Sequence, residues 1–176
     1  MIRYKTAQNL EELHQILALQ KNNVPEILSE QEKESQGFVT VRHTIGILER
    51  MNAKCPHIIA KTDTEVIGYA LCMHPDFEEE IPILQPMFSE IRTRLKTPLS
   101  FIIMGQICID KRYRGQGVFR KLYRKMKEVA TPEFDVVITE IDVRNTRSME
   151  AHTAIGFKTL GTYQADNRTW ALVVLE

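Results

Sequence analysis

The sequence lacks an excess of charge of either sign. Its 176 residues include 23 basic and 23 acidic side chains, which give a formal net charge of +0 at pH 7. Proteins that bind nucleic acid without regard to base sequence usually carry a strong basic excess. We therefore expect no nucleic-acid partner, and any positive surface must be local.

Cysteine is scarce, and its spacing matches neither a disulfide framework nor a zinc site. Cys55, Cys72 and Cys108 form no CxxC pair, and each lies in or beside an apolar run. Such residues are usually buried thiols in a reducing compartment. The histidines are also scattered, outside any thiol or carboxylate set with ligand spacing. The sequence thus predicts no metal site.

Long apolar runs, repeats and low-complexity linkers are missing as well. No stretch reaches the roughly 18 apolar residues that a membrane-spanning helix needs. The first residues lack the apolar core and the cleavage site of a signal peptide. We expect a cytoplasmic protein without membrane association, folded as a single domain over residues 1–176.

The apolar periodicity predicts a mixed α/β (α+β) fold with a mostly antiparallel sheet. Residues 57–61 and 66–73 form a predicted hairpin, and FIIMGQICI is typical of a central strand, in which Gly105 indicates a bulge or a close backbone approach. Strand, helix and strand over 101–143 form a parallel crossover. Other expected elements are a strand at 2–6, a helix capped by Asn9 that ends before Val24–Pro25, a short strand at 38–41, helices near 45–51, 87–95 and 148–155, and a terminal hairpin turning near 165–167.

A basic, glycine-containing turn joins the central strand to the next helix. It reads RYRGQG from Arg112 to Gly117. A helix that starts at Val118 exposes unpaired N–H groups and a positive dipole end, and the glycines leave room for an oxygen. These features suit a diphosphate, although a solvated glycine turn has the same pattern. A P-loop, GxxxxGK[ST], is absent, and the dinucleotide fingerprint GxGxxG fails at Arg120.

The turn resembles the [Q/R]-x-x-G-x-[G/A] signature of the GNAT superfamily of N-acetyltransferases, and the preceding QICID resembles that family's fourth strand. Asn145, Ser148, His152 and Gly156-Phe157 resemble the family pattern Asn-x-x-Ala-x-x-x-Tyr-x-x-x-Gly-Phe. The resemblance covers roughly residues 57–175, while the first 50 residues match only in element order. It implies a GNAT-like mixed sheet with helices on both faces.

The resemblance also implies acetyl-CoA as co-substrate, with no metal. In that reading Ile109 N–H polarises the acetyl carbonyl, and Asn145, beside Ser148, bonds the cofactor's amide arm; Asn145 could equally cap the following helix. The pantetheine would pair with the backbone of Ile107, Cys108 and Ile109. The pyrophosphate would be held by the N–H groups of Arg112, Tyr113, Arg114, Gly115, Gln116, Gly117 and Val118.

The main candidates for the catalytic acid and base are His152 and Glu140. His152 stands where many family members have a tyrosine, so its imidazole could protonate the leaving thiolate, or it could simply pack beside the cofactor. Glu140 and Asp142 share one face of the fifth strand, and Glu140 is the first choice for the general base. The alternative for Glu140 is a structural ion pair with Lys or Arg. Gln106 and Tyr163 are further candidates for orienting the substrate.

The predicted function is transfer of an acetyl group from acetyl-CoA to a primary amine by direct attack. The acceptor, a small molecule or a peptide, has no signature in the sequence; residues 74–99, with four of the seven prolines, are the expected wall of its site. The alternative is an acyl-CoA-binding regulatory or scaffold module without turnover. The terminal strands could also pair between subunits of a homodimer.

Overall fold

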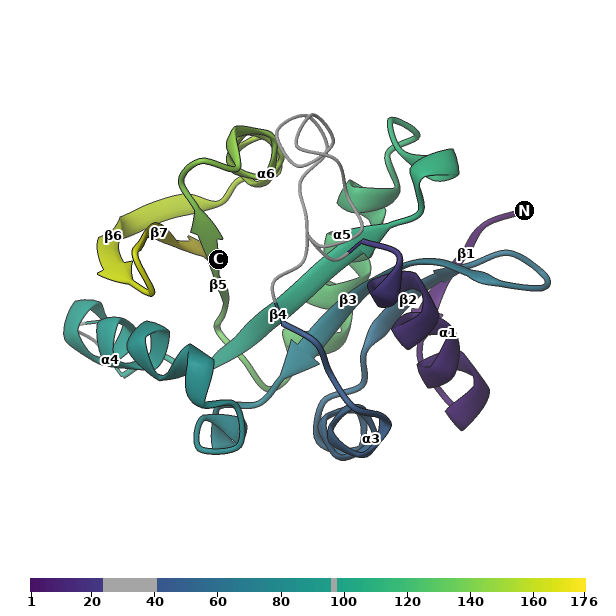
Figure 1. Cartoon of the computed structure of the whole chain (residues 1–176), viewed down its shortest axis with the longest axis horizontal. Helices are drawn as coiled ribbons and strands as arrows, with labels where there is room; N and C mark the ends of the chain where they lie inside the picture. The colour runs from purple at the N-terminus through teal and green to yellow at the C-terminus, as the bar shows by residue number, and fades with distance from the viewer. Residues whose placement is uncertain (24–40, 96–97) are drawn as a thin grey trace.

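The structure is a computed structural model, and it describes residues 1–23, 41–95 and 98–176. Seven strands form one sheet in the order β1-β2-β3-β4-β5-β7-β6 (Figure 1). All neighbouring strands are antiparallel except β4 and β5, which are parallel. The strands are β1 Arg3–Thr6, β2 Ile58–Lys61, β3 Val66–Met73, β4 Phe101–Ile109, β5 Val136–Asp142, β6 Lys158–Ala165 and β7 Arg168–Leu175.

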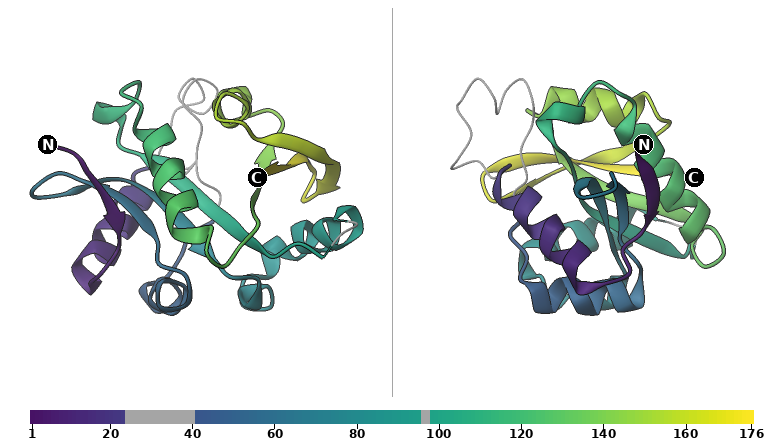
Figure 2. Two further views of the ribbon diagram at one scale, coloured as in Figure 1. Left: turned by 180° about the vertical axis from the view of Figure 1, so that it is seen from behind. Right: turned by 90° about the vertical axis from the view of Figure 1, so that its right-hand side faces the viewer.

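Helices cover both faces of this sheet, as expected from the sequence. Helix α5 lies on one face, which Figure 2 shows from behind, and α1 and α3 lie on the other. The described helices are α1 Leu10–Lys21, α3 Ile45–Lys54, α4 Gln85–Arg94, α5 Val118–Ala130 and α6 Thr146–Thr153, with 3-10 turns η1 Pro75–Phe77, η2 Pro82–Leu84 and η3 Lys111–Tyr113. Among the described residues, no helix is both long and apolar enough to span a bilayer.

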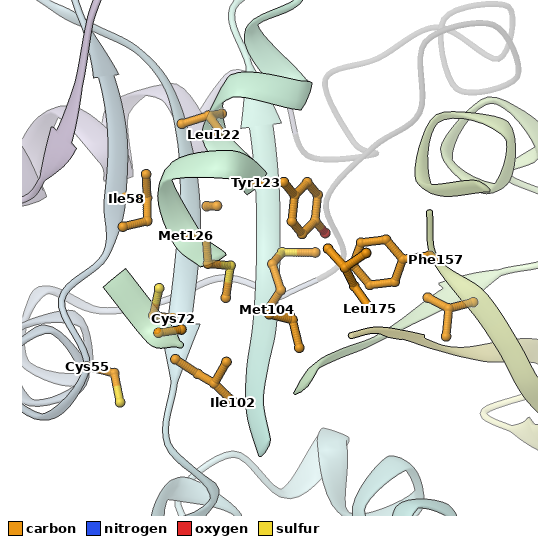
Figure 3. Packing of buried hydrophobic residues seen from close by; sticks show 14 of the residues in the cluster. Cys55, Ile58, Cys72, Ile102, Met104, Leu122, Tyr123, Met126, Phe157 and Leu175 are labelled. Carbon is orange, nitrogen blue, oxygen red and sulfur yellow. The ribbon is translucent and has the colours of Figure 1, made fainter. Parts of the chain in front are cut away.

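Alternation along the strands distributes the core between these layers. Leu122, Tyr123 and Met126 of α5 point onto β2, β3 and β4, where they contact the cluster that includes Ile58 and Cys72 (Figure 3). The opposite face of β3 packs on α1 and α3. Residues two apart on a strand share a face, so the central strands are buried on both sides. The three cysteines are buried free thiols.

Local signals in the sequence explain several element ends. Asn9 caps α1 by accepting a hydrogen bond from Glu12 N–H at 3.0 Å, as expected, but the Glu12 carboxylate bonds Gln8 N–H rather than Asn9 N–H. The turn between β6 and β7 places Asp166 and Asn167 at φ +50° and +57°, a conformation that these residue types tolerate. Val24–Pro25, the expected end of the first helix, and most of the expected strand at 38–41 lie outside the described residues; α1 itself ends at Lys21.

Strands β4 and β5 pair over only part of their length. Phe101–Ile103 of β4 pairs with Val136–Ile138 of β5, after which the hydroxyl of Thr139 donates to the carbonyl of Met104 at 2.8 Å. At this level β4 carries an extra residue, Gly105, relative to Leu71 and Cys72 of β3. The bulge that the sequence indicated is therefore present, and bulges increase local twist. Beyond it the two strands diverge (Figure 1).

Candidate active site

The glycine turn follows β4 directly and ends at the first residue of α5. Gly115 and Gly117 have φ values of +74° and +75°, where residues with a Cβ are strained. A Cβ built on either residue would meet nothing within 4 Å. Crowding by neighbouring atoms therefore does not require glycine at these two positions, but their positive φ values favour it. The absence of side chains also leaves the space above the turn open.

The amide groups of this turn divide into two sets. Arg112 N–H donates to the Asp110 carboxylate at 2.9 Å, Tyr113 N–H to the Asp110 carbonyl at 2.9 Å, and Arg114 N–H to the Lys111 carbonyl at 3.4 Å. These three expected phosphate donors are thus used inside the protein. The remaining amides of the expected run, from Gly115 to Val118, precede the first hydrogen bonds of α5, and their role as phosphate donors stays a prediction.

The arginine side chains of the turn, Arg112 and Arg114, bond different partners. Arg112 bonds Asp110 and Glu65, and these partners raise the pKa of its guanidinium. Arg114 instead donates to the Ile109 carbonyl at 3.0 Å and to the Asn23 side chain at 2.8 Å. Of these two arginines, only Arg114 lines the adjacent cavity. Asn23, which belongs to no motif recognised in the sequence, lines it too.

That cavity has a volume of about 310 Å³ and runs from the glycine turn along the free side of β4 to the start of α6. It contains most of the cofactor-binding residues expected from the sequence; Arg112 and Gln116 are not in its wall, and the Gln116 amide bonds the Arg112 carbonyl at 3.0 Å. The lining residues are Asn23, Ile107, Cys108, Ile109, Tyr113, Arg114, Gly115, Gly117, Val118, Phe119, Asn145, Arg147, Ser148 and Ala151.

The edge of β4 presents alternate backbone groups to this cavity. Asp110 N–H donates to the Ile67 carbonyl of β3 at 2.9 Å, and Cys108 pairs opposite Tyr69 of the same strand. Antiparallel alternation then turns the amides of Ile107 and Ile109 away from β3, toward the diverging side. The Cys108 backbone is used by β3, so a pantetheine-like chain could pair only with Ile107 and Ile109. Burial raises the pKa of the Cys108 thiol to about 12.

The residues at the start of α6 border the same space. The Asn145 side chain caps α6 by accepting from Ser148 N–H at 3.1 Å, which leaves its NH₂ group for other acceptors. Asn145 and Ser148 line both this cavity and a neighbouring one. Capping and cofactor binding are therefore compatible roles for Asn145.

His152 is enclosed in an aromatic cluster. Its Nδ1 lies 2.7 Å from the Ser148 carbonyl, which can only accept, so Nδ1 carries the proton and Nε2 accepts from the Tyr123 hydroxyl at 2.8 Å. The rings of Phe119, Tyr123 and Phe157 lie within 5.4 Å of its own. Burial lowers the pKa of His152 to about 4. This geometry favours the packing interpretation, while the catalytic role stays a prediction.

A second cavity of about 100 Å³ lies where β4 and β5 diverge. It adjoins the first cavity, with which it shares the lining residues Ile107, Asn145 and Ser148, and Glu140 of β5 also lines it. Gln106 also borders it, but its amide oxygen accepts from Tyr69 and Gln20. Its NH₂ group donates to the Val41 carbonyl at 2.8 Å, so Gln106 holds the segment at Val41 in place.

The two carboxylates of β5 have different environments. Burial would raise the pKa of Asp142, but hydrogen bonds from Arg144 at 2.8 and 3.1 Å lower it. Glu140 hydrogen-bonds the Tyr163 hydroxyl instead. Burial, with a smaller contribution from the negative charge of Asp166, raises the pKa of Glu140 to about 7, against the lowering effect of the Tyr163 hydrogen bond. Asp142 is therefore the carboxylate of β5 that forms an ion pair with an arginine. Glu140 bonds a tyrosine hydroxyl instead, and its pKa is about 7.

A third cavity, of about 180 Å³, lies on the other side of Glu140. Glu140 and Trp170 line both it and the second cavity. The three cavities thus form a series from the glycine turn, through the gap between β4 and β5, to the Tyr163 side of the sheet. Among the residues that the structure describes, no group of three or more His, Cys, Asp or Glu side chains is arranged to hold a metal ion.

Comparison with known structures identifies the same fold. The ribosomal-protein-S18-alanine N-acetyltransferase from Escherichia coli is 10% identical, with a TM-score of 0.65 over 99% of this chain and 93% of that chain. The yncA protein of Salmonella typhimurium, solved with its cofactor acetyl-CoA, is 13% identical, with a TM-score of 0.67 over 100% and 94%. An N-acetyltransferase from Staphylococcus aureus Mu50 is 19% identical, with a TM-score of 0.64 over 100% and 98%.

Comparison by sequence is more specific. No curated protein matches the chain, but the model of the acetyltransferase (GNAT) family matches residues 11–157. This match covers most of the chain, including the glycine turn, Glu140 and α6. The chain therefore belongs to the GNAT family of acetyltransferases, whose acetyl donor is acetyl-CoA.

Proposed function

We propose that the chain transfers an acetyl group from acetyl-CoA to a primary amine of a small-molecule or peptide acceptor by direct attack. The observation that carries this proposal is the series of three adjacent cavities that share lining residues, with Glu140 in the wall of both the second and the third. A donor in the first cavity and an acceptor in the third would meet beside Glu140. The fit of the donor end to a diphosphate supports the cofactor assignment, because open amides and a helix N-terminus converge there.

The cofactor would bind along the first cavity. Amides from Gly115 to Val118 would receive the pyrophosphate, with Arg114 adding positive charge. Asn145 would donate its NH₂ group to a pantetheine carbonyl, and the outward amides of Ile107 and Ile109 would pair with the pantetheine arm. When bound, acetyl-CoA supplies an activated thioester carbonyl.

The reaction then needs a proton acceptor and a donor for the developing oxyanion. The Glu140 carboxylate would take the proton from the attacking amine, directly or through one water. The amine nitrogen forms the C–N bond, and collapse of the tetrahedral species breaks the C–S bond and releases CoA thiolate, which takes a proton from the site or from water. A backbone N–H of β4, from Ile107 or Ile109, would hydrogen-bond the oxyanion, a type of contact worth roughly 3 kcal/mol. Ile107 is better placed than the expected Ile109, because it borders both the first and the second cavity.

Calorimetry with acetyl-CoA and a thiol-release assay with primary amines test the proposal together. Micromolar binding and amine-dependent release of CoA are the expected results. Binding without turnover across amines of varied size and charge would instead support the non-catalytic acyl-CoA-binding module. No binding at high micromolar acetyl-CoA would refute both.

A further inference from the structure

The third cavity has a chemical character of its own. Glu140 and Tyr163 close its inner end, and its walls come from Val41, from η2 and α4, and from the β6–β7 hairpin. Six of its ten lining residues are apolar, and its charged residues are Glu140 of β5, Asp166 of the hairpin turn and Arg168 of β7. The lining residues are Val41, Ile83, Leu84, Pro86, Glu140, Tyr163, Ala165, Asp166, Arg168 and Trp170.

The volume of the cavity limits what it can enclose. At about 180 Å³ it is comparable with apolar protein cavities of roughly 150 Å³ that admit one benzene molecule. Trp170 forms a fixed part of the wall, because its indole N–H donates to the Ala165 carbonyl at 3.3 Å. The position of Val41 is fixed by Gln106. The cavity therefore has room for one compact group rather than for an extended chain.

The charged residues that line the cavity differ in how far they are already engaged by other groups of the protein. Arg168 lies 3.9 Å from the Asp142 carboxylate and over the Trp170 ring, 5.9 Å from its centroid. A carboxylate on the acceptor would have to compete with Asp142 for it. A second ammonium group could be paired only at the hairpin turn, where Asp166 lines the cavity. Placed against Val41, Ile83 and the other apolar residues, it would lose its hydration without gaining a partner, which is unfavourable.

We propose that the acceptor is a primary amine that carries one compact, uncharged apolar group, about the size of a single ring or a short branched alkyl chain. The amine nitrogen lies beside Glu140, and the apolar group fills the space between Ile83, Leu84 and Trp170. This inference rests on the proposed function and narrows its acceptor.

A panel of acceptors tests the inference through kcat/KM in the thiol-release assay. Phenethylamine and 3-methylbutylamine represent the proposed class, while putrescine and free phenylalanine add a second charge to similar frames. Because burying one apolar side chain is favourable by about 1.5–3 kcal/mol, the amines of the proposed class should be preferred over putrescine about 10- to 100-fold. Free phenylalanine has the same ring as phenethylamine, but it should be a poorer acceptor because its carboxylate must compete with Asp142 for Arg168. Equal or higher kcat/KM for putrescine or phenylalanine would overturn the inference while leaving the acetyltransferase proposal standing.

Two variants locate the effect in the third cavity. Ile83→Gln changes a wall residue that is 52% exposed, and Leu10→Gln is its matched control, 48% exposed on α1. Ile83→Gln should lower kcat/KM for 3-methylbutylamine about tenfold and leave ethanolamine unaffected, whereas Leu10→Gln should change neither. Ala165→Leu, which fills the cavity, should suppress phenethylamine more than ethylamine. If both cavity variants behaved like the control, the apolar group would not bind there and the inference would fail.

A chain that binds acetyl-CoA but acetylates no amine in the panel would refute the proposed function and this inference together. Turnover of polar amines alone would refute only the inference. The affinity for acetyl-CoA, measured for every variant by calorimetry, shows that the donor site stays intact in each comparison.

Discussion

The hydrogen bond between Tyr163 and Glu140 should set the pH dependence of the reaction. Burial raises the pKa of the Tyr163 hydroxyl, so this group keeps its proton and donates to the Glu140 carboxylate. The bond stabilises the charged form of Glu140 and holds its pKa at about 7, below the value that burial alone would give. Removing the hydroxyl should therefore raise the pKa of Glu140.

The size of the effect follows from the strength of that bond. A hydrogen bond to a charged group contributes about 1.5–3 kcal/mol, which corresponds to about 1–2 pKa units. In Tyr163→Phe the pKa of Glu140 would then rise to about 8–9, and the ionised fraction at pH 7 would fall from about one half to about 1–10%. Since the carboxylate is the active form, kcat/KM at pH 7 should drop about 5- to 50-fold.

The assay is kcat/KM for one amine at pH values from 6 to 9.5, expressed as the ratio of variant to parent at each pH. This ratio cancels the titration of the acceptor amine. For Tyr163→Phe the ratio should climb toward one as the pH rises past the new pKa. For Glu140→Gln it should stay low throughout, by about 10²–10⁴-fold, because a general base has been removed. Unfolding by urea and calorimetry with acetyl-CoA would show that neither variant has lost the fold or the donor site.

Two results would refute this reasoning. A Glu140→Gln variant with near-parental kcat/KM would remove Glu140 from the chemistry. A Tyr163→Phe variant reduced by the same factor at every pH would mean that the hydroxyl acts by positioning, not through the ionisation of Glu140.

The remaining predictions concern the donor site and stability. Gly117→Val should weaken acetyl-CoA binding at least tenfold by calorimetry, while Gly117→Asn, which tolerates the positive φ, should bind better than valine does; equal affinities for parent and both variants would contradict the phosphate cradle. Burial lowers the pKa of His57 to about 3 from 6.5, so the fold excludes the proton and stability falls as the pH drops below 6.5. His57→Asn should therefore recover about 2 kcal/mol of the stability lost between pH 7 and pH 5 in urea titrations. Leu122→Ala, at a fully buried position under α5, should destabilise the chain by about 3–5 kcal/mol in the same assay.

Elements with a local signal were predictable from the sequence. The Asn9 cap, the hairpins and the start of α5 after Gly117 rest on residues that act on their own backbone. The parallel crossover was predictable because strand, helix and strand followed one another with short connections. The family pattern at Asn145 and the glycine turn supplied the location of the donor cavity.

Features that depend on tertiary contacts were not predictable. Nothing in the sequence indicates that the side chain of Asn23 would accept a hydrogen bond from Arg114, which lies 91 residues later in the chain. The partner of His152 Nε2 is the hydroxyl of Tyr123, which lies 29 residues earlier on another helix. The pKa of Glu140 likewise depends on Tyr163 and Asp166 of the β6–β7 hairpin. Each of these contacts depends on how the helices and the sheet pack together. The alternation of apolar and polar residues along a strand does not predict such contacts.

The bulge at Gly105 links the fold to the proposed chemistry. A Cβ on Gly105 would meet only the Leu71 carbonyl, at 3.9 Å, so crowding does not require glycine there; the extra residue itself is what matters. Without that residue the remainder of β4 would shift by one position against β3, and every later side chain would change faces. Gln106 would leave its buried bonds to Tyr69, and the outward amides of Ile107 and Ile109 would turn toward β3. One extra residue in β4 therefore sets both the acceptor wall held by Gln106 and the free edge available to the cofactor.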